Sequence, residues 1–229
     1  MTLPNFDAVL FDVGGVLLLP DPRVLGPVLE FYGGDGSQEA CVRAHYAGMA
    51  AKSAAGVLEK DWDAYNRAYV RSVGVPEHDF EQALTEFEET RNGWTWRWPI
   101  PSSLDAIGAL HASGVPLGVV SNASGQVEQL LRRSGVCQRG DGPLVPMRVI
   151  VDSHVVGVEK PDPRIFDHAL VHFEGIERSR IAYVGDSLVM DVRGARAAGL
   201  IPVLVDPYGD AEGHDVTRIG GIADLLDWF

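Results

Sequence analysis

The sequence predicts an α/β protein with a Rossmann-like parallel sheet as its core and a small helical cap domain. From about residue 99 onward, short apolar runs alternate with helical patterns, which is typical of right-handed βαβ units in a parallel sheet. Residues 20–95 instead show helical patterns, many aromatic residues and no convincing buried strand. We therefore expect a core formed by residues 1–19 and 96–229, with residues 20–95 as a helical cap inserted just after the first strand.

The first predicted element is the strand 8–11, which is followed directly by an acidic residue. Four apolar residues in a row favour a strand that is buried on both faces. Asp12 comes next, at the carboxyl edge where open α/β sheets bind their ligands. Gly14 and Gly15 then let the backbone turn sharply. Asp and Gly also end strands simply because they form turns, so Asp12 alone leaves a catalytic and a structural interpretation open.

The remaining elements of the core alternate in type. Helices are predicted where apolar residues recur at helical spacing; Gly135 and Gly199 mark helix ends, and Pro163 occupies a first turn. Strands are predicted at the short apolar runs between the helices, and a polar loop spans 138–143. The expected helices are 102–113, 126–133, 163–173 and 189–198, and the expected strands are 115–120, 148–151, 181–184 and 201–205.

Charge and composition exclude several classes of partner. The 229 residues include 19 basic and 32 acidic ones, and the net charge of −13 argues against nucleic acid or an anionic membrane as a partner. No apolar run approaches the ~18 residues needed to cross a bilayer, and residues 1–7 lack the basic start and apolar stretch of a secretion signal. Only Cys41 and Cys137 are present, which gives no disulfide framework. We expect a cytoplasmic protein, either a monomer or a dimer.

The ends of later strands place polar and acidic residues at the same edge as Asp12. Ser121 and Asn122 follow one strand, and Asp186 follows another, with Asp191 at the start of the next helix. Because parallel strands present their carboxyl ends on one edge, these side chains can meet there. Three carboxylates in one crevice repel one another and need a cation, and oxygen ligands alone select a hard ion such as Mg²⁺. Compensation of the helix dipole is the alternative role for Asp191.

Lys160 is one of three lysines, beside 16 arginines, and it precedes a predicted helix. A cation is disfavoured at a helix N-terminus, but an anion bound by the lysine and the helix amides together would resolve this conflict. Ser121 and Asn122 could donate hydrogen bonds to the same anion. The alternatives are a solvated loop lysine and ordinary turn chemistry for the Ser-Asn pair.

Taken together, these sites resemble the motifs of the haloacid dehalogenase-like hydrolases, which are mostly phosphatases. The motifs occur in the family's order and span nearly the whole core. The predicted helical insert matches the cap that one branch of the family carries between its first and second motifs. The matching stretches are 11–17 (FDVGGVL), 120–122 (VSN), 157–166 (GVEKPDPRIF) and 185–187 (GDS) with Asp191.

The resemblance implies a Mg²⁺-dependent phosphatase that acts on a small phosphorylated metabolite through an aspartyl-phosphate. Asp12 would be the nucleophile and also a metal ligand. The backbone carbonyl of Gly14 and the carboxylate of Asp186 would complete the protein ligands of Mg²⁺. Asp191 would be a further ligand or would orient the ligands through hydrogen bonds without binding the ion itself.

The same resemblance implies a set of phosphate-binding residues. Ser121 and Lys160 would hold the transferring phosphoryl oxygens and offset their charge. Asn122 would orient the nucleophile or the substrate. Gly15 would allow the backbone to approach the phosphate closely.

One position departs from the pattern of most phosphatases in the family, which carry an aspartate two residues after the nucleophile as general acid and base. That position is Gly14 here, although glycine also occurs in a branch that includes sugar-phosphate phosphatases. A water or another residue could substitute, the leaving group could need little help, or activity could be low. The main alternative is a catalytically weak or non-catalytic binding or regulatory protein on the same fold.

Other activities of the family fit the sequence less well. A dehalogenase does not need the acidic pair at positions 186 and 191, and a mutase relies on the missing acid. A phosphonate-cleaving enzyme needs a Schiff-base lysine from the cap, for which Lys52 and Lys60 are the candidates, although surface lysines would explain both. Several cap residues could contact substrate or could simply pack, namely His45, Tyr46, Trp62, Tyr65 and Arg67, and Trp94, Trp96 and Trp98 could cover the hinge.

Overall fold

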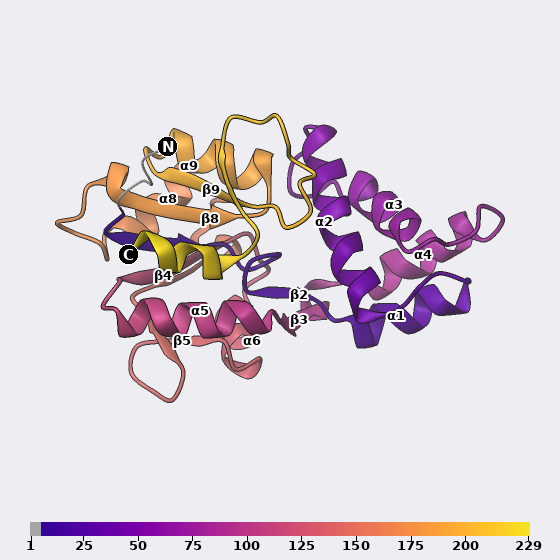
Figure 1. The fold of residues 1–229 in the computed structure, drawn as a ribbon, viewed down its shortest axis with the longest axis horizontal. Coiled ribbons are helices and arrows are strands. Elements are labelled where there is room, and N and C mark those ends of the chain that lie inside the picture. Colours follow the sequence, from indigo (N-terminus) through magenta and orange to yellow (C-terminus); the bar gives the residue numbers. More distant parts are fainter. Residues whose placement is uncertain (1–5) are drawn as a thin grey trace.

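The computed structural model describes residues 6–229, so residues 1–5, the start of the N-terminal stretch interpreted above, lie outside the described residues. The main sheet has six strands in the order β10-β9-β8-β1-β4-β7, and every pair of neighbours is parallel (Figure 1). This confirms the predicted α/β class. The strands are β1 (Ala8–Phe11), β4 (Leu117–Ser121), β7 (Ile150–Asp152), β8 (Ile181–Gly185), β9 (Ile201–Val205) and β10 (Thr217–Ile219).

β1 lies inside the sheet, between β4 and β8. All four of its residues are completely buried, which explains the uninterrupted apolar run in the sequence. The chain passes from β1 to β4 and β7 on one side before it crosses to β8 on the other. The carboxyl ends of β1 and its two neighbours therefore flank a topological switch point, where open α/β sheets bind their ligands.

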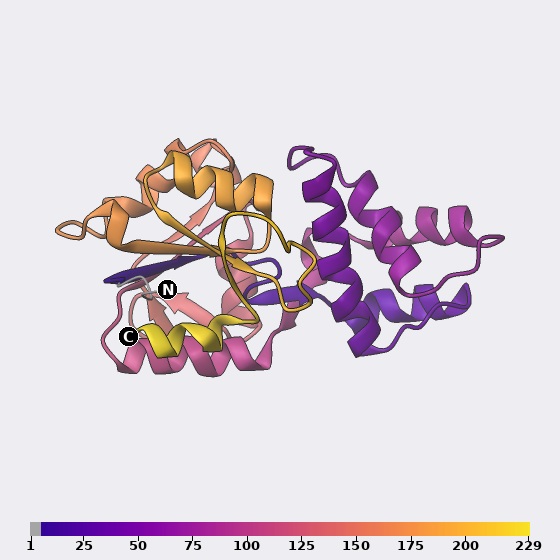
Figure 2. The same cartoon turned by 45° about the horizontal axis from the view of Figure 1, so that its top comes forward.

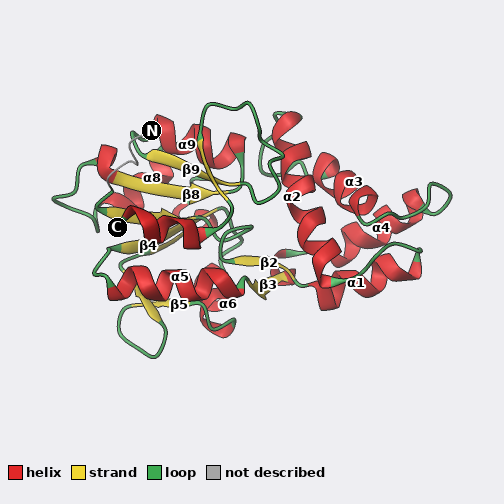
Figure 3. Ribbon diagram, in the orientation of Figure 1, coloured by secondary structure: helices red, strands yellow, loops and turns green. Residues whose placement is uncertain are grey.

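Helices cover both faces of this sheet, as Figures 2 and 3 show. Val9 and Phe11 of β1 belong to a hydrophobic cluster with α5 (Pro101–Ala112), α6 (Val127–Arg133) and the 3₁₀ segment η4 (Ile222–Trp228). Ala8 and Leu10 belong to a second cluster with α8 (Arg164–Leu170) and α9 (Arg193–Ala197). The alternation of side chains along β1 thus fixes the strand between two apolar layers.

Four helices form a separate unit, which we call the cap: α1 (Pro22–Phe31), α2 (Gln38–Ala54), α3 (Asp63–Ser72) and α4 (Phe80–Thr90). Figure 1 shows this unit beside the carboxyl edge of the sheet. The cap has its own hydrophobic core, in which Tyr65, Tyr69 and Phe87 are completely buried. Aromatic residues at helical spacing in this part of the sequence therefore mainly pack against one another.

The two chain segments that connect the cap to the core pair with each other. β2 (Leu18–Pro20) and β3 (Trp96–Pro99) form an antiparallel two-stranded sheet that the hydrophobic pattern did not predict. The short 3₁₀ turn η1 (Gly93–Thr95) precedes β3. Of the three tryptophans expected at the hinge, Trp96 and Trp98 lie in β3 and are partly buried, whereas Trp94 is 49% exposed.

Several elements differ in extent from the prediction. The helix expected at 189–198 begins as a π-helical turn, η3 (Leu188–Val192), and the helix expected at 163–173 ends at Leu170. The π-helical turn carries Asp191, whose carboxylate accepts the backbone N–H groups of Asp186 and Ser187. The wider π-helical turn therefore places the Asp191 carboxylate against these two backbone amides, at the site described below.

Small elements complete the described chain. A parallel pair of short strands, β5 (Cys137–Arg139) and β6 (Val145–Met147), flanks the loop that was expected at 138–143. The short helix α7 (Ser153–Val156) and the 3₁₀ turn η2 (Arg178–Arg180) lie in loops of the core. Among the described residues, no helix combines the length and the apolar character that a membrane span requires.

Candidate active site

The predicted residues converge at the carboxyl edge of the sheet. Asp12 follows β1, Ser121 ends β4, Asp186 follows β8, and Lys160 lies in the loop before α8. All four line a cavity of about 960 Å³ between the core and the cap, together with Gly14, Asn122 and Asp191. The topology of the sheet thus brings together side chains that are far apart in the sequence.

Three carboxylates form a buried acidic cluster in this cavity. Asp12, Asp186 and Asp191 each offer an oxygen, and these oxygens lie within 4.8 Å of one another. Burial, reinforced by the charge of Asp191, raises the pKa of Asp186 well above its usual range. Burial also raises the pKa of Asp12 to about 6, against the opposing effect of Lys160. Such a cluster is a strong candidate for binding a divalent cation.

Both carboxylate oxygens of Asp191 accept hydrogen bonds, so its role goes beyond compensation of a helix dipole. Its Oδ2 accepts the N–H groups of Asp186 at 3.0 Å and of Ser187 at 2.9 Å. Its Oδ1 accepts a hydrogen bond from Lys160 Nζ at 2.7 Å. Because both oxygens already have protein partners, Asp191 is better placed to orient Asp186 and Lys160 than to bind an ion directly.

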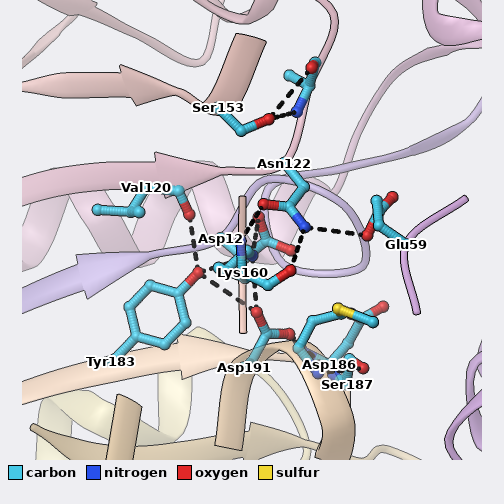
Figure 4. A network of polar contacts seen from close by, with 12 residues as sticks. Asp12, Glu59, Val120, Asn122, Ser153, Lys160, Tyr183, Asp186, Ser187 and Asp191 are labelled. Carbon is cyan, nitrogen blue, oxygen red and sulfur yellow. Dashed lines mark hydrogen bonds and ion pairs between the residues drawn. The ribbon is translucent and has the colours of Figure 1, made fainter. Parts of the chain in front are cut away.

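Lys160 is the charge partner of the acidic cluster. It is only 2% exposed, and its Nζ lies 2.9 Å from Asp12 Oδ1 and 2.8 Å from the hydroxyl of Tyr183. Burial opposes its charge, but the carboxylates of Asp12 and Asp191 outweigh that effect and raise the pKa of Lys160. The solvated loop position is therefore excluded. The ammonium group is directed to the acidic cluster, as Figure 4 shows.

The helix amides play no part in this arrangement. The first amide of α8, that of Arg164, is bound by the carboxylate of Asp162 at 3.0 Å. The expectation that Lys160 and these amides jointly bind an anion therefore gains no support from the structure, because the first amide of α8 already has an acidic partner.

Asn122 connects three parts of the site. Its side-chain oxygen accepts the N–H of Lys160 at 2.8 Å, and its amide group donates to the Lys160 carbonyl at 3.1 Å. The same amide group donates to Glu59 Oε2 of the cap at 3.1 Å (Figure 4). Asn122 therefore fixes the loop that carries Lys160 and also contacts the cap directly.

Gly15 has a different role from the phosphate contact predicted for it. Its N–H donates to the Leu18 carbonyl at 2.9 Å, and its carbonyl accepts the hydroxyl of Tyr46 at 2.8 Å. Its φ is +66°, and a Cβ at this position would collide with the Asp186 carboxylate. Glycine is therefore needed here for backbone conformation and for space, because its amide already has a partner.

A histidine of the cap forms a hydrogen bond with a carboxylate of the acidic cluster. His45 of α2 is completely buried, with Nε2 at 2.9 Å from Asp186 Oδ2 and Nδ1 at 3.0 Å from the Tyr65 hydroxyl. Burial lowers the pKa of His45 to about 3. His45 and Tyr65 thus form a polar contact between cap and core. Among the other cap residues proposed to contact substrate, Trp62 lines the cavity, whereas Arg67 pairs with acidic residues of the cap.

Lys52 is not a surface lysine, which was one of the two interpretations that the sequence left open. It is 2% exposed, its Nζ donates to the Glu59 carbonyl at 2.8 Å, and it lies 3.4 Å from the centre of the Trp62 ring. Burial lowers the pKa of Lys52. Its role in the structure is to hold the cap loop that carries Glu59. Sequence analysis missed Glu59 because no motif surrounds it.

The fold and the site place the chain among α/β hydrolases that carry a helical cap over a carboxylate at the sheet edge. The profile of the haloacid dehalogenase-like hydrolases matches residues 6–199, and the chain belongs to this family. It is 34% identical over 166 residues to the phosphoserine phosphatase of Thermus thermophilus, a match that covers 71% of this chain and 62% of that relative.

Two further comparisons are consistent with this assignment. The chain is 35% identical over 129 residues to the phosphoglycolate phosphatase of Rhodospirillum rubrum, which covers 56% of this chain and 49% of that relative. The chain therefore spans only about half to two thirds of the length of these curated relatives. The crystal structure of a HAD phosphatase from Thermococcus onnurineus shares the fold, with a TM-score of 0.57, 21% identity and 97% coverage of both chains.

Proposed function

We propose that the protein is a Mg²⁺-dependent phosphatase that hydrolyses a small phosphorylated metabolite through an aspartyl-phosphate on Asp12. The observation that carries this proposal is the ion pair between Asp12 and Lys160 in a cavity that also contains Ser121 and the acidic cluster. The names of the two relatives, a phosphoserine phosphatase and a phosphoglycolate phosphatase, support a small phosphate ester as substrate.

Asp12 is suited to act as the nucleophile. Its Oδ1 is 2.9 Å from Lys160 Nζ, which leaves Oδ2 to attack phosphorus. The ammonium group of Lys160 and the hydroxyl of Ser121 would bind the phosphoryl oxygens and offset the charge that develops during transfer. Asn122 would keep Lys160 in position, because it is bonded to both the N–H and the carbonyl of that residue.

The donor set of the cavity fits Mg²⁺. Asp12, Asp186 and the carbonyl of Gly14 offer hard oxygen ligands, and Asp191 supports Asp186 from behind. Lys160 alone cannot balance the charge of three carboxylates, so a divalent cation would relieve their repulsion. When bound, Mg²⁺ would supply positive charge beside the phosphoryl group and help to orient it.

The charge and the cysteine content of the chain bear on where the enzyme acts and on what kind of molecule. We infer a cytoplasmic protein that acts on a small molecule, supported by the net charge of −13 and by the presence of only two cysteines, both buried. A non-catalytic binding protein is less well supported, because a buried lysine among three carboxylates is expensive to maintain without a function that needs it. Of the two cap lysines that a phosphonate-cleaving enzyme could use, Lys52 is buried and bonded to the Glu59 carbonyl, whereas Lys60 is exposed and lines the cavity.

The test is phosphate release from a panel of phosphorylated metabolites, with Mg²⁺ and with a chelator. We expect activity only with Mg²⁺, and a loss by a factor of about 10³ or more in Asp12→Asn. Glu86→Gln, an exposed cap substitution, is the matched control and should leave activity unchanged. Absence of hydrolysis by folded, Mg²⁺-loaded protein across the panel would refute the proposal.

A further inference from the structure

Position 14 cannot provide a proton to the leaving group, because it is a glycine. An alkoxide that departs from phosphorus needs a proton, and general acid catalysis is worth roughly 10²–10⁴-fold in rate. The space beside Gly14 is also occupied: a Cβ at this position would lie 2.9 Å from Cζ3 of Trp96. The proton donor must therefore come from another part of the cavity.

Glu59 is a carboxyl group that the cap presents to this cavity. It lies in the loop between α2 and α3 and lines the cavity together with Asp12 and Lys160. The residue is fixed at two points, since Oε2 accepts from Asn122 Nδ2 at 3.1 Å and the Glu59 carbonyl accepts from Lys52 Nζ at 2.8 Å. Figure 4 shows the hydrogen bond between the Asn122 amide group and the Glu59 carboxylate.

The position of Glu59 agrees with the geometry of phosphoryl transfer. The attacking and leaving oxygens lie roughly in line on opposite sides of phosphorus. Because Asp12 would attack from the sheet edge, the leaving oxygen would face away from the core and toward the cap. Glu59 is the cap carboxyl group in the described lining of the cavity.

Other acids in the lining are less suitable. Asp162 is paired with Arg164, which lowers its pKa to about 2, so it carries no proton at neutral pH. Glu159 is exposed to solvent and belongs to the core loop before Lys160. His154 also lines the cavity, but it lies in α7 of the core. His45 lies outside this lining, and its two ring nitrogens are bonded to Asp186 and Tyr65.

The surroundings of Glu59 favour a protonated carboxyl group. Burial raises its pKa, and the charge of Asp12 acts in the same direction. Lys52, Lys160 and the hydrogen bond from Asn122 oppose this shift without cancelling it. The direction of this shift suits a carboxyl group that donates a proton and takes it back.

We propose that Glu59 is the general acid and base of the phosphatase and takes the role that Gly14 cannot fill. This inference rests on the function proposed above. In the first step the bond between Asp12 and phosphorus forms, the bond from phosphorus to the leaving oxygen breaks, and the Glu59 proton passes to that oxygen. In the second step the Glu59 carboxylate takes a proton from the water that attacks phosphorus, Asp12 is released, and inorganic phosphate leaves.

The test compares two substrates in the variant Glu59→Gln. Nitrophenolate leaves as a stable anion, so p-nitrophenyl phosphate needs no proton, whereas glycerol 2-phosphate releases an alkoxide that does. We expect the first turnover of glycerol 2-phosphate to slow by roughly 10²–10⁴-fold, while the p-nitrophenol burst keeps nearly the wild-type rate and is followed by slow turnover. Gln retains an oxygen that can accept the hydrogen bond from Asn122.

Controls separate this inference from the function on which it rests. Glu86→Gln should leave both first-turnover rates unchanged, and thermal melting should show that Glu59→Gln is folded. Equal slowing of both substrates, or no slowing of either, in an otherwise active enzyme would overturn the role of Glu59 alone. A folded, Mg²⁺-loaded wild-type protein that hydrolyses neither these two substrates nor any member of the panel would overturn the proposed function and this role with it.

Discussion

The indole ring of Trp96 fills the space that a side chain at Gly14 would need. A Cβ at position 14 would lie 2.9 Å from the ring, closer than ordinary contact allows. The ring centre lies 5.4 Å from that of His45 and 6.0 Å from that of Trp62, so neighbouring aromatic residues restrict its movement. The missing acid at position 14 is thus part of a packed arrangement between the hinge and the cap.

This packing predicts that even a methyl group at position 14 is harmful. We expect Gly14→Ala to lower the free energy of unfolding by about 1–3 kcal/mol, because Trp96 must shift. Gly108→Ala is the matched control, since a Cβ there meets nothing within 4 Å and a helical alanine should stabilise by about 0.5–1 kcal/mol. Urea unfolding would measure both. A neutral Gly14→Ala would show that the indole moves freely.

Lys160 is expected to be essential for stability as well as for activity. Lys160→Met keeps much of the side-chain volume but leaves Asp12 and Asp191 buried without their cationic partner. The free energy of unfolding should fall by about 3 kcal/mol in urea titrations without added metal. Lys60→Met, at an exposed cap position, should change it by less than about 0.5 kcal/mol. Similar values for the two variants would argue against a buried ion pair.

Much of the core could be predicted because its signals are local. The apolar run before Asp12 marks a strand buried on both faces, and the alternation of elements marks a parallel sheet whose carboxyl edge collects Asp12, Ser121 and Asp186. Lys160 could be singled out by its rarity and its place before a helix. Its burial could not be predicted, because that depends on the path of the loop over β4 and β8.

The relation between cap and core could not be predicted for a physical reason. His45 and Asp186 are 141 positions apart, and their contact depends on how the whole cap is oriented by β2 and β3. Nothing in the local sequence of Glu59 distinguishes it from a solvated glutamate. Only the folded arrangement places it against Asn122.

His45 should contribute strongly to stability through this contact. His45→Ala leaves a cavity and removes the hydrogen-bond partner of Asp186 and of Tyr65. We expect a loss of about 3 kcal/mol in the free energy of unfolding, together with faster proteolysis of the cap. His78→Ala is the control, because that side chain is 78% exposed and should matter by less than about 0.5 kcal/mol. Equal effects of the two substitutions would contradict the role of His45.

Asp21 should stabilise the hinge in a pH-dependent way. This 1% exposed residue caps α1, and its carboxylate accepts hydrogen bonds from Arg23 and from Arg97 of β3. Burial opposes its charge, but these hydrogen bonds outweigh it and lower the pKa of Asp21 below 3.8. Asp21→Asn preserves the cap of the helix and removes the charge. We expect it to cost about 1 kcal/mol at pH 7, because both arginines are largely exposed.

The sign of the pH effect follows from the direction of that pKa shift. A carboxyl group whose pKa is lower in the folded protein stabilises it fully above the unfolded value of 3.8, and the contribution disappears as the pH falls through the folded value. The free energies of unfolding of wild type and Asp21→Asn, measured in urea, should therefore differ by about the same amount at pH 7 and at pH 5. Both pH values lie about one unit or more above the unfolded pKa. The difference should shrink below about pH 4. A difference that grows on acidification would mean that burial raises the pKa of Asp21 in the folded protein. The ionised carboxylate would then not stabilise the hinge.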